Sequence, residues 1–253
     1  MTTPVRKLGR RLSPHDRRTL WFWDYFNRPT LPPAPASCDW TKAVAWPWGM
    51  MANDTVGDCV LAAAGHLIES WTYNAGDPYV PPDAAILAAY SAITGYNPAD
   101  PSTDIGTDPL SALKYWRATG ISGHQIGAFA ATNAKRQEQI QQAIYLFGGS
   151  FLSFALPAAA QGLAAWDIPQ GTAPEGQWEP GSWGGHEVCA VGYSPAGVTV
   201  ITWGAPLLVS WNFLATYCDE SYAVLSNDLL NGQGQCPAGF DLPTLVADLA
   251  KIG

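Results

Sequence analysis

The chain has 253 residues, of which 47% are hydrophobic and 13% are charged. This composition excludes a disordered chain and allows one large domain, or two lobes that share a core. The net charge is −8, and the first 28 residues hold seven of the 13 basic residues, so the rest of the chain is strongly acidic. An acidic body repels phosphate backbones, which argues against nucleic acid as a partner.

Targeting and cysteine patterns favour a reducing compartment. Arg10-Arg11 is followed by polar residues, so we find no export signal and expect a cytoplasmic protein. Residues 143–166 carry no charge, but glycine, proline and polar residues interrupt them, so no membrane association is expected. Five widely spaced cysteines argue against a disulfide scaffold and a zinc site, although a Cys218–Cys236 bridge stays open. We expect no metal or cofactor, and the sequence leaves the oligomeric state undetermined.

In chain order, the sequence predicts three parts. Residues 1–35 form a basic arm and a proline-rich linker, anchored to the body by the aromatic residues Trp21, Trp23, Tyr25 and Phe26. Residues 36–230 form the main domain, with a helical lobe at about 45–125 and a β lobe at about 126–228, and residues 231–253 form a tail with an amphipathic helix. The predicted helices are 59–71, 83–94, 108–119, 135–147 and 241–252, and the predicted strands are 150–156, 187–193, 198–203, 207–211 and 222–225. Helices followed by antiparallel strands indicate an α+β fold.

Two residues suit nucleophilic chemistry. Cys59 opens a predicted helix after a glycine-containing turn, and His186 follows two glycines at the start of a predicted strand. A thiol attacks a carbonyl as its thiolate, and a helix N-terminus with a nearby imidazolium lowers the thiol pKa. Each residue by itself is more often structural. His66 is expected to be buried and hydrogen-bonded, and His124 to lie in a loop without a partner.

The order of motifs around these residues resembles the papain family of cysteine peptidases. Asp39-Trp40 resembles the start of the mature family domain, and Gly106-Thr107 its glycine-rich substrate segment. Residues 185–193 resemble the strand of the catalytic histidine, and residues 201–204 resemble the family's Asn-Ser-Trp-Gly. The resemblance covers about residues 36–228. It implies a papain-like two-lobe fold with a helical N-terminal lobe and an antiparallel, β-barrel-like C-terminal lobe.

The resemblance also implies roles for individual residues. Cys59 is the expected nucleophile, His186 carries the proton, and Asn53 joins the Cys59 backbone N–H in holding the oxyanion. The expected substrate-binding residues are Gly106, Thr107, Gly185, Trp203 and Trp183. Of these, Trp203 is also expected to shield the histidine from water.

Three positions depart from the family pattern. Ile201 or Thr202 stands where the family has the asparagine that orients the histidine. A Cys-His dyad, help from Thr202, or an orienting group from elsewhere are all open. Asp58 precedes the nucleophile and would raise its pKa unless the carboxylate points away. Val56 replaces a usual half-cystine, which fits a reducing compartment.

The sequence therefore predicts a papain-like thiol hydrolase that cleaves a peptide or amide bond of a peptide or protein substrate through an acyl-enzyme. The same residues are equally compatible with cleavage of an isopeptide or a cell-wall amide, and with acyl transfer. The alternative is a catalytically weak or inactive papain-like module that binds a partner or builds a structure, of phage or prophage origin and then virion-associated or in the host cytoplasm. The arm is too short for the helical prodomain of secreted relatives and is expected to be a strap or a segment over the cleft.

Overall fold

The computed structural model describes residues 6–25, 31–44, 47–229 and 241–252. It combines helices with one seven-stranded antiparallel sheet, as the predicted α+β class requires. The helices are α1 (Cys59–Ala75), α2 (Asp83–Thr94), α3 (Pro109–Ala118), α4 (Gln137–Phe147), α5 (Trp211–Tyr217) and α7 (Leu242–Ile252). The strands are β1 (Cys38–Asp39), β2 (Ile126–Ala131), β3 (Ser150–Leu156), β4 (Gly184–Ser194), β5 (Gly197–Thr202), β6 (Ala205–Ser210) and β7 (Cys218–Ser226).

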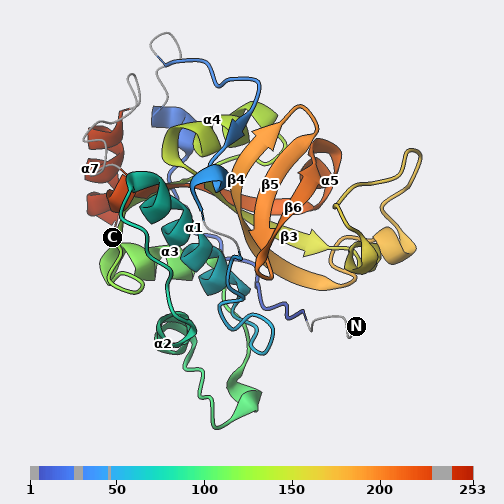
Figure 1. Ribbon diagram of the computed structural model, residues 1–253, viewed down its shortest axis with the longest axis horizontal. Helices are drawn as coiled ribbons and strands as arrows, with labels where there is room; N and C mark the ends of the chain where they lie inside the picture. Colours follow the sequence, from blue (N-terminus) through green and yellow to red (C-terminus); the bar gives the residue numbers. More distant parts are fainter. Residues whose placement is uncertain (1–5, 26–30, 45–46, 230–240, 253) are drawn as a thin grey trace.

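The sheet places β4 at the boundary of two lobes. Its strands lie in the order β2-β7-β3-β4-β5-β6, and the short β1 pairs with β4. Figure 1 shows α1, α2 and α3 gathered on one side, with β4, β5 and β6 on the other. Helix α1 packs against β4. The start of α1 and the start of β4 are therefore the places where side chains of the two lobes meet.

Helix α1 forms the core of the helical lobe. Its sequence is apolar on most faces, as expected for a helix that other elements surround, and every residue from Cys59 to Thr72 is buried. Near its end, the Trp71 ring stacks on Trp116 of α3 at 5.5 Å between ring centroids. A second core cluster fills the β lobe, where Trp166 stacks on Phe213 of α5. The cluster around α1 also includes Phe151 and Cys189 of the sheet, so the two lobes share part of their core.

The sequence predicted most helices and strands and missed strands β1 and β2 and helix α5. Helix 83–94 and strand 150–156 have the predicted bounds, and most other predicted ends differ by a few residues. Strand β2 was not predicted, because its sequence IGAFAA lacks a clear alternation of apolar and polar residues. Helix α5 was also missed. It starts where Ser210 accepts a hydrogen bond from the Phe213 N–H at 3.1 Å, so the predicted strand 207–211 ends one residue early.

The N-terminal arm is anchored by Tyr25, as predicted, and by Phe22, which the sequence did not indicate. Phe22 is completely buried and packs edge-on against Phe147 of α4. Trp21, by contrast, is 53% exposed, so its predicted role as an anchor is wrong. The short 3-10 turn Phe22–Tyr25 directs Phe22 into the core instead. Phe26 lies outside the described residues.

Helix α7 packs on the body as its amphipathic pattern predicts. Leu245 and Leu249 are buried in the cluster that contains Phe22. The Tyr25 hydroxyl donates to the Asp248 carboxylate at 3.0 Å. Residues 22–25 of the arm and helix α7 are thus packed together.

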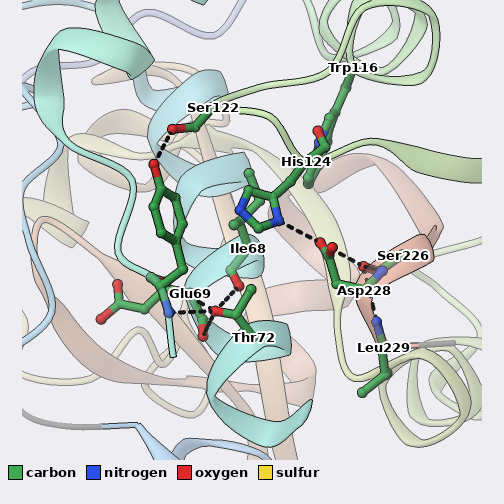
Figure 2. Close-up of polar contacts among 10 residues, drawn as sticks. Ile68, Glu69, Thr72, Trp116, Ser122, His124, Ser226, Asp228 and Leu229 are labelled. Carbon is green, nitrogen blue, oxygen red and sulfur yellow. Dashed lines mark hydrogen bonds and ion pairs between the residues drawn. The ribbon is translucent and has the colours of Figure 1, made fainter. Parts of the chain in front are cut away.

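His124 has a partner, contrary to the prediction for a loop histidine. Its Nδ1 lies 2.9 Å from the Asp228 carboxylate, and its ring lies 4.8 Å from the Tyr79 ring. Figure 2 shows His124 pointing toward Asp228, with Ser226 and Leu229 beyond it. The pair joins the loop before β2 to the residues after β7. His66 is buried and 2.8 Å from the Gly49 carbonyl oxygen, as predicted.

Two further observations concern the cysteines and the length of the helices. Cys38, Cys59, Cys189 and Cys218 are free, and Cys236, with the open bridge to Cys218, lies outside the described residues. Within the described ranges, no helix is both long and apolar enough to cross a membrane.

Candidate active site

Cys59 and His186 lie near the starts of two elements that pack together, helix α1 and strand β4. Cys59 is the first residue of α1, and the backbone N–H of Glu187 in β4 hydrogen-bonds its sulfur. His186 precedes Glu187, and consecutive Cα atoms are about 3.8 Å apart. The backbone of His186 is therefore one residue away from the N–H that contacts the Cys59 sulfur. Both side chains are buried.

The His186 imidazole is held by a hydroxyl and two indoles. Its Nε2 lies 2.7 Å from the Thr202 hydroxyl oxygen. The Trp203 ring stacks on the imidazole at 4.2 Å, and Trp166 contacts it edge-on at 6.3 Å. Nδ1 is buried and has no hydrogen-bond partner among the described residues, so it is available to take a proton. Of the two residues left open by the sequence, Thr202 contacts the imidazole, while Ile201 is buried in the core.

The loop before α1 uses the Asn53 amide internally. Asn53 Nδ2 donates to the Val56 carbonyl at 3.1 Å and to the Asp58 carboxyl at 3.2 Å. Donation from Asn53 to an oxyanion therefore requires the amide to release one of these acceptors. The first-turn N–H groups of α1, including that of Cys59, have no acceptor within the helix and point toward its N-terminus.

Asp58 is buried beside the nucleophile. Burial raises the pKa of its carboxyl to about 8, although the hydrogen bond from Asn53 acts in the opposite direction. Asp58 is therefore mostly protonated at neutral pH and brings little negative charge to Cys59. One carboxyl oxygen, Oδ2, has no partner in the described part of the chain.

Residues 6–11 of the arm fill the groove between the lobes. Arg10 donates its N–H to the Gly185 carbonyl at 3.1 Å on the β-lobe wall, and the Trp203 indole donates to the Lys7 carbonyl at 3.1 Å. On the helical-lobe wall the hydrogen bonds are Lys7 N–H to Asn53 O at 3.2 Å, Thr107 N–H to Gly9 O at 2.9 Å and Arg11 N–H to Thr107 O at 2.8 Å. The arm thus lies in the groove as an extended peptide.

Most residues predicted to bind substrate contact this arm. Thr107, Gly185 and Trp203 form the hydrogen bonds just described. Gly106 faces Gly9 so closely that a Cβ on Gly106 would come within 2.0 Å of the Gly9 carbonyl oxygen. Trp183 stacks on Trp203 at 5.6 Å.

Gly9 is the point of closest approach. A Cβ built on Gly9 would lie 1.7 Å from the Gly57 carbonyl oxygen, far inside contact distance. The Gly9 N–H also hydrogen-bonds the Cys59 sulfur. Only a glycine at this position lets the arm pass directly over the thiol.

The covered pair is uncharged. Burial raises the pKa of the Cys59 thiol to about 12, with smaller effects of the same sign from Glu187 and Asp58. Burial lowers the pKa of His186 to about 3, and the positive charge of Arg6 adds to this effect. While the arm is in place, the site therefore holds a neutral thiol and a neutral imidazole at physiological pH.

Tyr90 and Asp104 shape the helical-lobe wall, and the sequence analysis missed both. Asp104 accepts from the Gly57 N–H at 3.0 Å and from the Tyr90 hydroxyl at 2.7 Å. The same hydroxyl accepts from the Gly106 N–H at 2.8 Å. These bonds connect the loop before Cys59 to the loop that contacts the arm. A single tyrosine in a helix and an aspartate in a loop carry no sequence signal for such a role.

No metal centre accompanies the pair. Among the described residues, no three His, Cys, Asp or Glu side chains lie close enough together to hold a metal ion.

Comparison with known proteins finds similarity in structure only. No family model matches the sequence, and no curated protein is similar to it in sequence. The fold is similar to that of xylellain, a cysteine protease from Xylella fastidiosa, with a TM-score of 0.65, 12% identity, and coverage of 89% of this chain and 98% of that one. It is also similar to procathepsin L 3 of Tenebrio molitor (TM-score 0.58, 13% identity, coverage 88% and 76%) and to procathepsin B of Trypanosoma congolense (0.56, 12%, 87% and 86%). At such low sequence identity, the structural similarity shows the fold alone. The activity has to be argued from the site.

Proposed function

From the papain-like fold of this chain, we propose that it is a thiol hydrolase that cleaves a peptide or amide bond, with Cys59 as nucleophile and His186 as base. One observation carries the proposal. The Cys59 sulfur, at the N-terminus of α1, hydrogen-bonds the N–H of the residue after His186, in a groove whose walls hydrogen-bond an extended peptide. A nucleophile, a base and a peptide-binding groove at one place are what amide hydrolysis needs.

The residues supply each step of the reaction. His186 Nδ1 takes the thiol proton, and the Cys59 thiolate attacks the carbonyl carbon of the substrate. The first-turn N–H of Cys59 donates to the developing oxyanion, assisted by Asn53 once its amide releases an internal acceptor. The imidazolium returns the proton to the leaving amine, and water then hydrolyses the acyl-enzyme. Throughout, Thr202 and Trp203 keep the imidazole in position.

Catalysis requires the arm to leave the groove. Residues 6–11 occupy the backbone contacts that a substrate would use, and their presence coincides with the high thiol pKa and the low imidazole pKa. Departure of the arm admits water to the pair, which lowers the pKa of the thiol and raises the pKa of the imidazole. We therefore propose that the arm keeps the enzyme latent.

Hydrolysis of fluorogenic peptides by the purified full chain tests the proposal. We expect Cys59→Ala and His186→Ala each to abolish hydrolysis in a chain that circular dichroism shows to be folded. His186→Ala should also lower the unfolding temperature, because the imidazole is buried against Trp166 and Trp203. Because the arm covers the site, the assay includes a variant in which the arm is displaced, such as Gly9→Leu. Hydrolysis that survives in Cys59→Ala would refute the assignment of the nucleophile.

A non-catalytic module is the second candidate. The observation in its favour is the groove itself, which the chain fills with its own arm over a neutral thiol. This candidate predicts that displacement of the arm produces neither hydrolysis nor rapid alkylation of Cys59. The two proposals therefore differ in the behaviour of one sulfur atom.

A further inference from the structure

The Arg10 side chain of the arm is buried in an acidic pocket beside the groove. Its side chain is 2% exposed. The guanidinium donates to the Asp219 carboxylate at 3.0 Å and to the Glu220 carboxylate at 3.0 Å. Asp219 and Glu220 start β7 and lie more than 200 positions from Arg10 in the sequence. The pocket is therefore a product of the fold rather than of a local turn.

A third carboxyl group completes the pocket from β4. In the sheet, Ser153 of β3 lies opposite both Glu187 and Glu220, and directly opposite residues share a face. Glu187 therefore lies on the same face as Glu220. Its Oε2 accepts a hydrogen bond from the Ser153 hydroxyl, and burial raises the pKa of its carboxyl well above the usual range. Glu187 is 2% exposed, and its Oε1 has no partner among the described residues.

Two carboxylates thus bind one guanidinium, and the Glu187 carboxyl lies on the same face of the sheet. The Arg10 Nε is also buried without a hydrogen-bond partner in the described structure, so the fit of Arg10 leaves donor and acceptor capacity unused. An anchor that served only to hold the arm would need no more than one of these carboxyl groups. The excess of acceptors indicates a pocket for guanidinium groups in general.

The pocket lies one residue from the nucleophile. The Gly9 N–H hydrogen-bonds the Cys59 sulfur, and Arg10 is the next residue. Thr107 bonds the backbone on both sides of Arg10, through Gly9 O and Arg11 N–H. These backbone bonds accept any peptide sequence. Among the arm's contacts in the groove, the acidic pocket is the one that distinguishes side chains next to the reacting bond.

We propose that Asp219, Glu220 and Glu187 form a specificity pocket for an arginine side chain of the substrate, close to the cleaved bond, which Arg10 of the arm occupies in the latent chain. The proposal rests on the proposed function and adds the substrate class. Arginine suits the pocket better than lysine because its planar fork reaches two carboxylates at once. A leucine side chain would leave the partly exposed Asp219 and Glu220 carboxylates without a cation.

The experiment uses full chains with the arm displaced. Gly9→Leu clashes with Gly57 and is expected to expel the arm, while Arg10→Glu achieves the same by repulsion from Asp219 and Glu220. If one variant fails to fold, the other serves. Matched fluorogenic peptides carry Arg, Lys or Leu at each of the two positions before the cleaved bond. We expect kcat/KM to be roughly ten- to hundredfold higher for Arg than for Leu at one position, with Lys between them.

Charge removal in the pocket tests the residues themselves. In the arm-displaced chain, Asp219→Asn combined with Glu220→Gln is expected to reduce the Arg-to-Leu ratio of kcat/KM to within about threefold of one. The exposed Arg11 supplies the control, because Arg11→Ala in the same background is expected to leave that ratio unchanged. Hydrolysis with no preference for Arg at either position would overturn the pocket proposal and leave the proposed function intact.

A binding measurement separates the two proposals. A synthetic peptide of residues 6–13, and its counterpart with Leu at position 10, are titrated into arm-displaced chains carrying Cys59→Ala, with fluorescence polarisation as the readout. The native peptide is expected to bind at least tenfold more tightly. If no peptide is hydrolysed, the proposed function fails, and this ratio still decides whether the pocket recognises a guanidinium. Equal binding of the two peptides would overturn the pocket.

Discussion

Replacement of Gly9 by leucine is expected to expose the nucleophile. A Cβ at this position would lie 1.7 Å from the Gly57 carbonyl oxygen and 2.7 Å from the Gly57 Cα. Those atoms belong to the backbone of the loop before α1. A shift of this loop would break the hydrogen bond between the Gly57 N–H and Asp104, so the loop resists displacement. The arm must therefore leave the groove and give up its hydrogen bonds to both walls.

The size of the effect follows from the thiol pKa. With the arm in place, the pKa of Cys59 is about 12, against an ordinary value of 9.0. A return to the ordinary value raises the thiolate fraction at neutral pH about a thousandfold, because each pKa unit is a factor of ten. A less basic thiolate is also a weaker nucleophile, with a Brønsted coefficient of about 0.4–0.5. The net acceleration of alkylation is therefore roughly 30-fold or more.

The assay is the rate of iodoacetamide alkylation at pH 7.5, assigned to Cys59 by mass spectrometry of peptides, because Cys38 is also partly accessible. Arg11→Ala, an exposed change in the same arm, is the matched control and is expected to leave the rate unchanged. Circular dichroism establishes that both variants fold. Equal alkylation rates in a folded Gly9→Leu variant and in the wild-type chain would refute the view that the arm controls the thiol.

Three further predictions concern the surroundings of the pair. Thr202→Ala removes the partner of His186 Nε2 and is expected to lower kcat of the arm-displaced enzyme roughly tenfold. Thr202→Ser should restore most of the lost rate. A full rate in the alanine variant would contradict an orienting role for Thr202. Asp58, whose pKa is raised from 3.8 to about 8, binds a proton more tightly in the folded chain, so its contribution to stability falls between about pH 4 and pH 8. Asp58→Asn should therefore raise the unfolding temperature more at pH 8 than at pH 5, and thermal melts with an equal change at both values would contradict this. Tyr90→Phe removes the hydroxyl that links Asp104 to the Gly106 N–H, and it should lower the free energy of unfolding by about 1–3 kcal/mol in urea titrations, whereas an unchanged midpoint would contradict the linkage.

The sequence by itself predicted most of the local structure and proposed Cys59 and His186 as the reactive pair. The apolar run after Cys59 predicts a buried helix, and the strand-like run from Glu187 to Tyr193 predicts the centre of β4. Both signals lie within a dozen residues, where periodicity and glycine positions are informative. The order of motifs then indicated the papain-like fold, which the structural neighbours share.

Only the tertiary structure decided what surrounds that pair. The sequence left open whether Ile201 or Thr202 meets the histidine, and the register of β4 with β5 places Thr202 at the imidazole. It also left the arm as a strap or a cover, and it gave no indication that Arg10 meets Asp219 and Glu220. The physical reason is sequence distance. Contacts across some 200 residues depend on how two lobes close around a groove, and no pattern within either segment encodes that closure.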